Sequence, residues 1–163
     1  MSPAAAPRSK TVATWLALAG GALGLHRFYL HGWGDRWGWL LWLPTLLGGW
    51  GALRMNALGQ DDRLAWVLTP FLGLTLSGAM LTAVVYGLTP RERWQARHDP
   101  AGSTRAWPWL DVVGAVAATA IGAIVLIATI AFVAQRSFEY AALPSSRGSA
   151  TSPPAAEGAS STR

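Results

Sequence analysis

The sequence of 163 residues contains no cysteine and few charged residues, which make up only 13% of the chain. Without cysteine, neither a disulfide nor a thiolate metal site can form. Soluble domains carry about 25% charged residues, so this chain has roughly half the polar surface that a water-facing domain needs. Apolar side chains make up 52% of it and include 10 Trp. The composition therefore argues against an ordinary soluble domain and favours a membrane protein.

Two long stretches lack charged residues altogether. Between Arg63 and Arg91 lie 27 uncharged residues, and between Asp111 and Arg136 lie 24. A helix rises about 1.5 Å per residue, so about 20 residues cross a hydrocarbon core of roughly 30 Å. Both stretches are long enough, and we expect each to form a membrane span.

Two shorter apolar segments precede these stretches. The run from residue 11 to residue 25 gives only roughly 22 Å of helix. We therefore extend the predicted helix to residue 30, with Arg27 reaching the lipid headgroups. A cleaved signal peptide is the alternative, because Arg8 and Lys10 precede the apolar run.

The sequence thus predicts an all-α integral membrane protein with four transmembrane helices and disordered ends. The helices are expected at about 11–30, 37–53, 64–88 and 112–134, between a leader at 1–10 and a tail at 137–163. We group them as a first helical pair over 11–55 and a second pair over 56–136. The tail is rich in Ala, Ser and Pro and lacks a periodic apolar pattern, which is typical of disorder. Four spans place both termini on the same side of the membrane.

The orientation is predicted from Arg and Lys, which are in excess in cytoplasmic loops. With the termini outside, the cytoplasmic loops hold six such residues near the membrane, and with the termini inside they hold five. The densest cluster lies in one short loop and consists of Arg91, Arg93, Arg97 and Arg105. We expect this basic loop in the cytoplasm and both termini outside it.

A basic and aromatic cluster ends the first apolar run. It consists of His26, Arg27, Phe28 and Tyr29, followed by Leu30 and preceded by Gly21 and Gly24. The pattern G-x-x-G-x-H-R-F-Y-L resembles the signature of the TM-two domain family, small proteins with two closely spaced membrane helices. The resemblance covers about residues 11–55. It implies that the motif turn is cytoplasmic, and it implies no general biochemical activity.

The chain departs from this family at two positions. His31 stands where the family usually has glycine, and Arg54 stands where an acidic residue is expected, although Trp50 fits the pattern. Two roles are open for the motif. Arg27 can bind a lipid phosphate or a partner carboxylate through its planar fork of donors, with His26 adding a donor. Alternatively, the motif only anchors a short helix at the membrane interface.

Small residues recur at helical spacing in two places. Gly20, Gly21 and Gly24 precede the motif, and Gly114, Ala118 and Gly122 form a stripe at four-residue intervals. Such stripes let membrane helices approach closely. They are expected to serve helix packing within the chain, with homodimerisation as the alternative.

No candidate catalytic site is evident, because all acidic residues and histidines fall at the ends of the predicted spans, in loops or in the tails. His26 and His31 are five residues apart and do not share a helical face, so we expect no metal site. No Gly-Lys-Ser or Gly-Lys-Thr follows the glycines, and we expect no cofactor. The basic residues lie between the apolar runs, which argues against nucleic-acid binding.

We therefore expect a non-catalytic scaffold or accessory subunit that acts through helix packing. Its expected partners are membrane lipids and a membrane-protein partner or a second copy of the chain. A small channel or transporter subunit is the alternative, with a bend at Pro44 beside a permeation path. Abundant Ala, Arg, Gly and Trp with a single Lys suggest a bacterium with a GC-rich genome. The expected location is the bacterial inner membrane, with multiple spans.

Overall fold

The computed structural model of the chain is all-helical over the residues it describes, which are 7–59, 62–105 and 107–149, with side chains as far as residue 141. The elements are α1 (Lys10–Gly20), the 3-10 turn η1 (Gly21–Leu23), α2 (Leu25–His31), α3 (Arg36–Leu40), α4 (Trp42–Leu58), α5 (Arg63–Leu88), α6 (Arg91–His98) and α7 (Pro108–Ser149). Two helices are long and apolar enough to cross a membrane, α5 and the Pro108–Ala141 part of α7.

The first apolar segment is not one helix. Helix α1 ends at Gly20, the turn η1 follows, and the chain reverses at Gly24, whose φ of 70° lies in the left-handed region. The chain then returns beside α1, so that the backbone N–H of Ser9 donates to the Tyr29 hydroxyl at 2.9 Å. The expectation of a continuous helix at 11–30 is therefore wrong, because glycine allows a backbone turn that other residues resist.

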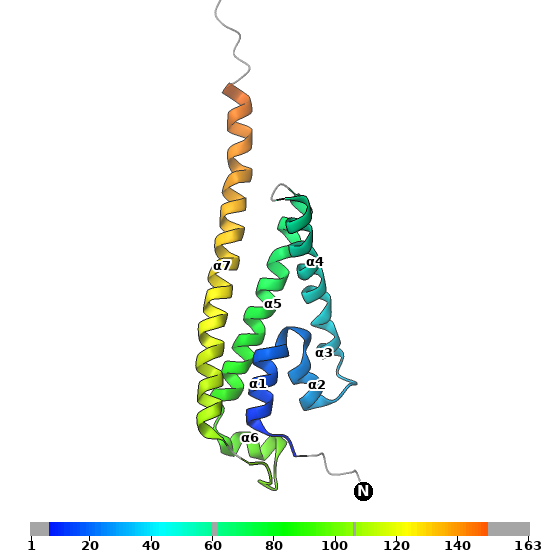
Figure 1. Ribbon diagram of the computed structural model, residues 1–163, viewed down its shortest axis with the longest axis vertical. Helices are drawn as coiled ribbons and strands as arrows, with labels where there is room; N and C mark the ends of the chain where they lie inside the picture. The colour runs from blue at the N-terminus through cyan, green and yellow to red at the C-terminus, as the bar shows by residue number, and fades with distance from the viewer. Residues whose placement is uncertain (1–6, 60–61, 106, 150–163) are drawn as a thin grey trace, which may run out of the picture.

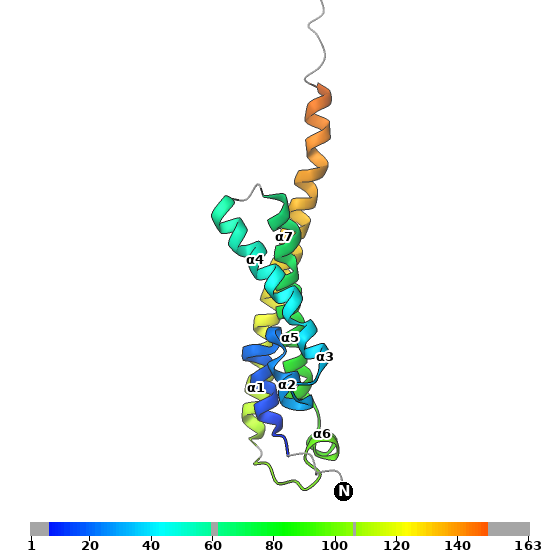
Figure 2. The same cartoon turned by 90° about the vertical axis from the view of Figure 1, so that its right-hand side faces the viewer.

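The α1–α2 hairpin is too short to cross a membrane. With 11 residues, α1 rises only about 16 Å, which is about half of a hydrocarbon core. Figure 2 shows α1 and α2 side by side, at the same end of the molecule as α6. The hairpin therefore enters and leaves at one end of the helix bundle.

Three of the remaining helices, α4, α5 and α7, lie along the long axis of the molecule (Figure 1). From the hairpin, α4 leads to the far end, α5 returns, and α7 leads to the far end again (Figure 1). The start of α1 and the end of α7 therefore lie at opposite ends. The expectation that both termini share one side rested on a first apolar segment that crosses the membrane, whereas this segment forms the α1–α2 hairpin.

The later helices also differ from their expected bounds. The segment predicted at 37–53 is divided at Leu41 into α3 and α4, whereas α5 agrees with the prediction within one residue. Helix α7 continues to Ser149, whereas the predicted tail begins at residue 137. Hydrogen bonds from Gln135 and Arg136 to Glu139 support this extension. Residues 1–6 and 150–163 of the predicted leader and tail lie outside the described residues.

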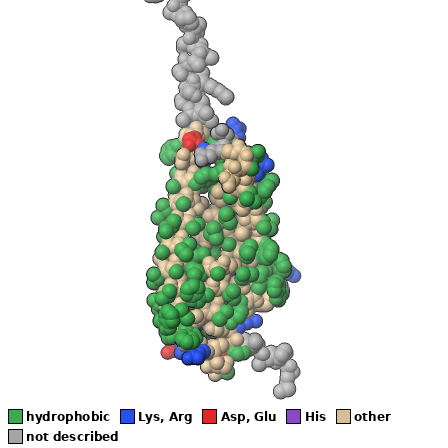
Figure 3. Space-filling view, in the orientation of Figure 1, with side chains coloured by type: hydrophobic (Ala, Val, Ile, Leu, Met, Phe, Trp, Pro, Cys, Tyr) green, Lys and Arg blue, Asp and Glu red, His purple; other side chains and the backbone are tan. Residues whose placement is uncertain are grey.

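The core is built from small side chains where α1, α5 and α7 meet. Ala17, Met80, Ala83 and Ala118 form one buried cluster. Large apolar side chains point outward instead, for example Ile124 of α7, which is 68% exposed. Figure 3 shows hydrophobic side chains along the length of this face and most of the visible charged ones near its two ends. Such a continuous apolar surface is typical of a protein that contacts lipid.

Candidate functional site

The α1–α2 hairpin, which contains the motif, packs closely against α3 at two glycines. A Cβ atom at Gly24 would lie 2.7 Å from the carbonyl oxygen of Gly38, and a Cβ atom at Gly38 would lie 2.7 Å from the ring of Phe28. Neither position has space for a side chain. The glycines before the motif therefore allow a sharp turn and a close backbone approach, and Gly20 and Gly24 lie in that turn instead of on one continuous helical face.

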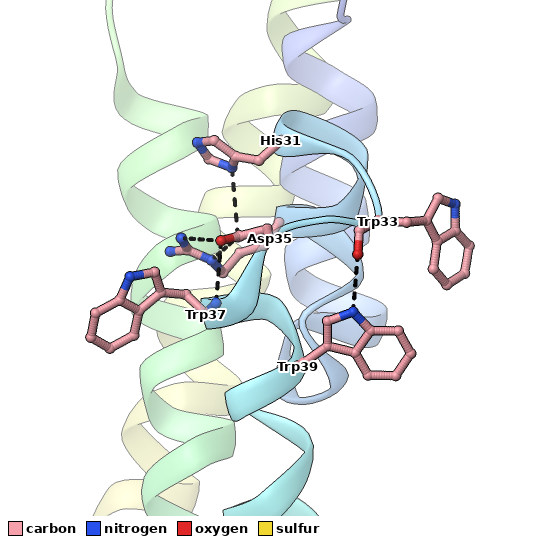
Figure 4. Close-up of polar contacts among 6 residues, drawn as sticks. His31, Trp33, Asp35, Trp37 and Trp39 are labelled. Atoms are coloured by element: carbon pink, nitrogen blue, oxygen red, sulfur yellow. Dashed lines mark hydrogen bonds and ion pairs between the residues drawn. The ribbon is translucent and has the colours of Figure 1, made fainter.

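Arg27 is paired within the hairpin. Its Nε donates to Asp35 Oδ2 at 2.6 Å and its Nη2 donates to Asp35 Oδ1 at 3.3 Å. Asp35 also caps α3 by accepting from the backbone N–H of Trp37 at 3.2 Å, and His31 Nδ1 lies 3.9 Å from it (Figure 4). The Arg27 guanidinium lowers the pKa of the Asp35 carboxyl below its ordinary value. This fork of donors is thus directed at Asp35, which favours the anchoring role of the motif.

Phe28 belongs to an aromatic cluster at the edge of the hairpin. Its ring stacks on Trp33 at 5.3 Å between centroids and meets Trp39 edge-on at 5.2 Å. The indole N–H of Trp39 donates to the carbonyl of Trp33 at 3.0 Å (Figure 4). Trp33 is 74% exposed. Exposed tryptophans beside an ion pair are typical of the membrane–water interface.

Tyr29 and Leu30 connect the hairpin to α6. Leu30 packs with Ala13 and Trp94 in a buried cluster, and Tyr29 lies against it. The indole N–H of Trp94 donates to the carbonyl of Arg8 at 2.9 Å. The motif therefore holds α6 in place as well as turning the chain.

The basic loop lies on the outer side of this contact. Trp94 is 4% exposed, whereas the four arginines named from the sequence are all exposed. Those residues are Arg91, Arg93, Arg97 and Arg105. The guanidinium of Arg105 lies 4.5 Å from the ring centroid of Trp107. The short helix α6 thus has one buried aromatic contact and a cationic outer face.

Asp99 fixes the loop that follows α6. Its carboxylate accepts four hydrogen bonds, from the backbone N–H and the hydroxyl of both Ser103 and Thr104, at 2.6 to 3.0 Å. The side chain is fully buried. These hydrogen bonds, those from Thr104 above all, lower the pKa of Asp99 to about 2. Asp99 is therefore charged at neutral pH and orders the segment that carries Arg105.

His26 is a buried side chain of α2. It is 4% exposed, its ring centroid lies 5.9 Å from that of Tyr86, and its Nδ1 has no hydrogen-bond partner in the described part of the chain. With Arg27, Thr75 and Thr82 it lines a cavity of about 410 Å³. The sequence placed His26 on a continuous helix at 11–30, whereas the turn at residues 21–24 brings α2 back beside α1 and buries this residue.

The predicted small-residue stripes lie inside the bundle. A Cβ atom at Gly114 would lie 3.0 Å from Thr14 Cγ2, and one at Gly122 would lie 2.7 Å from Met80 Cβ. Ala118 is fully buried between them. This face of α7 therefore packs against α1 and α5 of the same chain. Gly21 likewise lies against α5, where a Cβ atom would come within 2.7 Å of that of Ala79.

Sequence reasoning missed four residues that hold the site together, Asp35, Trp94, Lys10 and Asp111. The hydrogen bond from Trp94 to Arg8 and the ion pair of Lys10 with Asp111, whose atoms are 3.4 Å apart, join elements that are distant in sequence. Asp35 could have been found as a helix N-cap before Trp37. No sequence pattern indicated the buried contact of Trp94, because a tryptophan in a basic loop is equally typical of a side chain at the membrane interface. Among the described residues, no group of three His, Asp or Glu side chains comes together.

Comparison with protein families finds a known domain in the first third of the chain. The family model of the TM2 domain matches residues 6–54, which confirms the resemblance to the TM-two domain family. The matched region contains α1, the turn, α2, α3 and most of α4. Comparisons with curated proteins and with solved structures gave no match.

Proposed function

We propose that this small membrane protein is a non-catalytic scaffold or accessory subunit of the bacterial inner membrane. Its TM2 segment supplies a re-entrant hairpin, which supports a cationic surface on α6. The observation that carries the proposal is the cluster of Ala13, Leu30 and Trp94, because it links the motif to α6. A purely interfacial anchor would not need that contact.

The positions of the basic side chains support one orientation. Among the side chains described, eight basic ones lie at or toward the end of the bundle that holds α6, and three lie at the other end. The first group is Arg8, Lys10, Arg27, Arg36, Arg91, Arg93, Arg97 and Arg105, and the second is Arg54, Arg63 and Arg136. By the positive-inside rule, the α6 end faces the cytoplasm. The start of α1 is then cytoplasmic, and α7 ends outside.

The proposed contact surface is the arginine face of α6 and its following loop. Each basic residue near an anionic membrane surface contributes about 1 kcal/mol to attraction. Four exposed arginines therefore contribute roughly 4 kcal/mol, and they can equally engage acidic side chains of a partner. Arg27 is not part of this surface, because Asp35 already accepts from its guanidinium.

Membrane extraction with a lipid-preserving polymer tests this proposal. One variant changes all four loop arginines to Gln, and a matched control changes the same four to Lys, which preserves the charge. We expect the Gln variant to lose the anionic lipid and the proteins that accompany the native chain, and the Lys variant to keep most of them. If the Gln variant retains the native lipid and protein composition, the proposed contact surface is wrong.

The cavity that His26 lines favours a second candidate function. Polar side chains at membrane depth often mark solute or ion pathways, and this cavity also contacts Arg27, Thr75, Thr82 and Pro44. The candidate is a channel or transporter subunit. Flux of an ion or a solute into proteoliposomes that contain only this chain would support it, provided that Thr82→Leu abolishes the flux. Equal flux in wild type, variant and protein-free vesicles would reject it.

A further inference from the structure

A second surface lies at the opposite end of the bundle, between α5 and α7. It is a groove of about 590 Å³ whose walls are almost wholly apolar. The wall residues are Val67, Pro70, Phe71, Leu74, Phe132 and Val133. Below the groove the two helices touch, since a side chain at Gly73 would collide with Thr129. The groove is therefore closed at its inner side and open along the lipid-facing surface.

Cationic and aromatic side chains stack at the outer end of this groove. The guanidinium of Arg63 lies 5.2 Å from the ring centroid of Tyr140, and that of Arg136 lies 4.5 Å from the ring centroid of Trp66. The two rings meet edge-on at 5.7 Å. The stack therefore joins α5 to α7 and places two guanidinium groups at the rim.

Among the side chains that the structure describes, the rim carries more positive than negative charge. Arg136 Nη1 donates to Glu139 at 2.6 Å, which compensates one of the two arginines. The nearby carboxylate of Asp62 accepts from Arg54 Nε at 2.6 Å, so this pair is neutral. Arg63 is exposed at the start of α5. The groove thus combines an apolar body with a cationic rim.

The length of the groove corresponds to one membrane leaflet. Arg63 and Leu74 are 11 residues apart on α5, which is about 16 Å along a helix. One leaflet contributes about half of a hydrocarbon core of roughly 30 Å. Arginine binds phosphate through paired donors, and interfacial Trp and Tyr lie at headgroup level.

We infer that this groove binds one anionic phospholipid of the leaflet at the C-terminal end of α7. An acyl chain lies along the apolar walls, and the lipid phosphate contacts the exposed guanidinium of Arg63. This inference requires the chain to lie in a membrane. It does not depend on the proposed surface at α6, which lies at the other end of the bundle.

Photo-labelling of the full chain in nanodiscs tests the site. The probe is phosphatidylglycerol with a photoreactive acyl chain, compared with phosphatidylcholine carrying the same acyl chain. Peptide mapping by mass spectrometry locates the label, so lipid bound near α6 is counted separately. We expect phosphatidylglycerol to label residues 67–74 and 132–137 about tenfold or more above phosphatidylcholine, as one charge-assisted hydrogen bond allows.

Two pairs of variants separate headgroup recognition from occupation of the groove. Arg63→Gln should lower the label about tenfold, whereas Arg36→Gln at the other end should leave it unchanged. Val133→Phe should lower it by filling the groove, whereas Ile127→Phe on the exposed face of α7 should not. If Arg63→Gln does not fold, the site is still tested by Arg63→Lys and by Val133→Phe with its control Ile127→Phe.

Three results would overturn the inference. Equal labelling by the two lipids would show an ordinary lipid contact. Labelling that neither Arg63→Gln nor Val133→Phe lowers would place the lipid elsewhere. Crosslinks from the groove to a second copy of the chain would assign the groove to a dimer interface.

Discussion

Replacing Gly24 with alanine should open the motif hairpin. Gly24 has a φ of 70°, and a Cβ atom there would lie 2.7 Å from the carbonyl oxygen of Gly38. The left-handed backbone costs an L-residue about 1–2 kcal/mol, and overpacking against a rigid neighbour costs about 1–3 kcal/mol. The free energy of unfolding should therefore fall by about 2–5 kcal/mol, or roughly 30-fold to several thousand-fold in the folding equilibrium.

Two measurements check this prediction in detergent micelles. Tryptophan fluorescence follows thermal unfolding, and spin labels at Val12→Cys and His31→Cys report the distance between α1 and α2. The chain contains no cysteine of its own, so both labels are specific. Gly49→Ala is the matched control, because a Cβ atom there would meet nothing within 4 Å and alanine is favoured over glycine in a helix. A Gly24→Ala variant with native stability and native label distance would refute the reasoning.

Three further predictions concern the ion pair, the loop and the helix packing. In a double-mutant cycle of Arg27→Gln and Asp35→Asn, the free energy of unfolding of the double variant should be close to that of the Arg27 variant alone. If the losses of the two single variants add up in the double variant, the two residues are not coupled. Asp99 has a pKa of about 2, below that of an unfolded carboxyl, so its stabilisation of the loop should be complete above about pH 4. This stabilisation should be lost as the pH falls toward 2, so that residues 100–105 lose their protection from hydrogen exchange only in that range. A loss of protection that already begins near neutral pH as the pH is lowered would contradict this assignment. Gly122→Val should separate α7 from α5 and lower the melting temperature, whereas Gly78→Val, with nothing within 4 Å, should lower it less.

Charge and hydropathy were sufficient to predict α5 and the position of α7, but not the point at which α7 ends. α5 lies within one residue of its predicted bounds because it has no charged residue between Arg63 and Arg91. The family resemblance was also found from the sequence, through the contiguous motif after spaced glycines, and the match over 6–54 confirms it.

The hairpin could not be predicted in the same way. Hydropathy treats Gly20 to Gly24 as part of an apolar run, whereas the structure uses the absence of side chains there for a turn. The contacts that hold this turn join distant segments, such as Leu30 with Trp94. No local pattern encodes such contacts, and the path of the chain after α1 and the burial of His26 both depend on them.

Topology mapping tests the central claim most directly, because a re-entrant hairpin leaves the two termini on opposite sides. A cytoplasm-active reporter and a periplasm-active reporter are fused in turn before residue 8, after residue 99 and after residue 149. We predict cytoplasmic signals at the first two positions and a periplasmic signal at the third. Signals from the same compartment at the first and third positions would contradict the hairpin and restore an even number of spans.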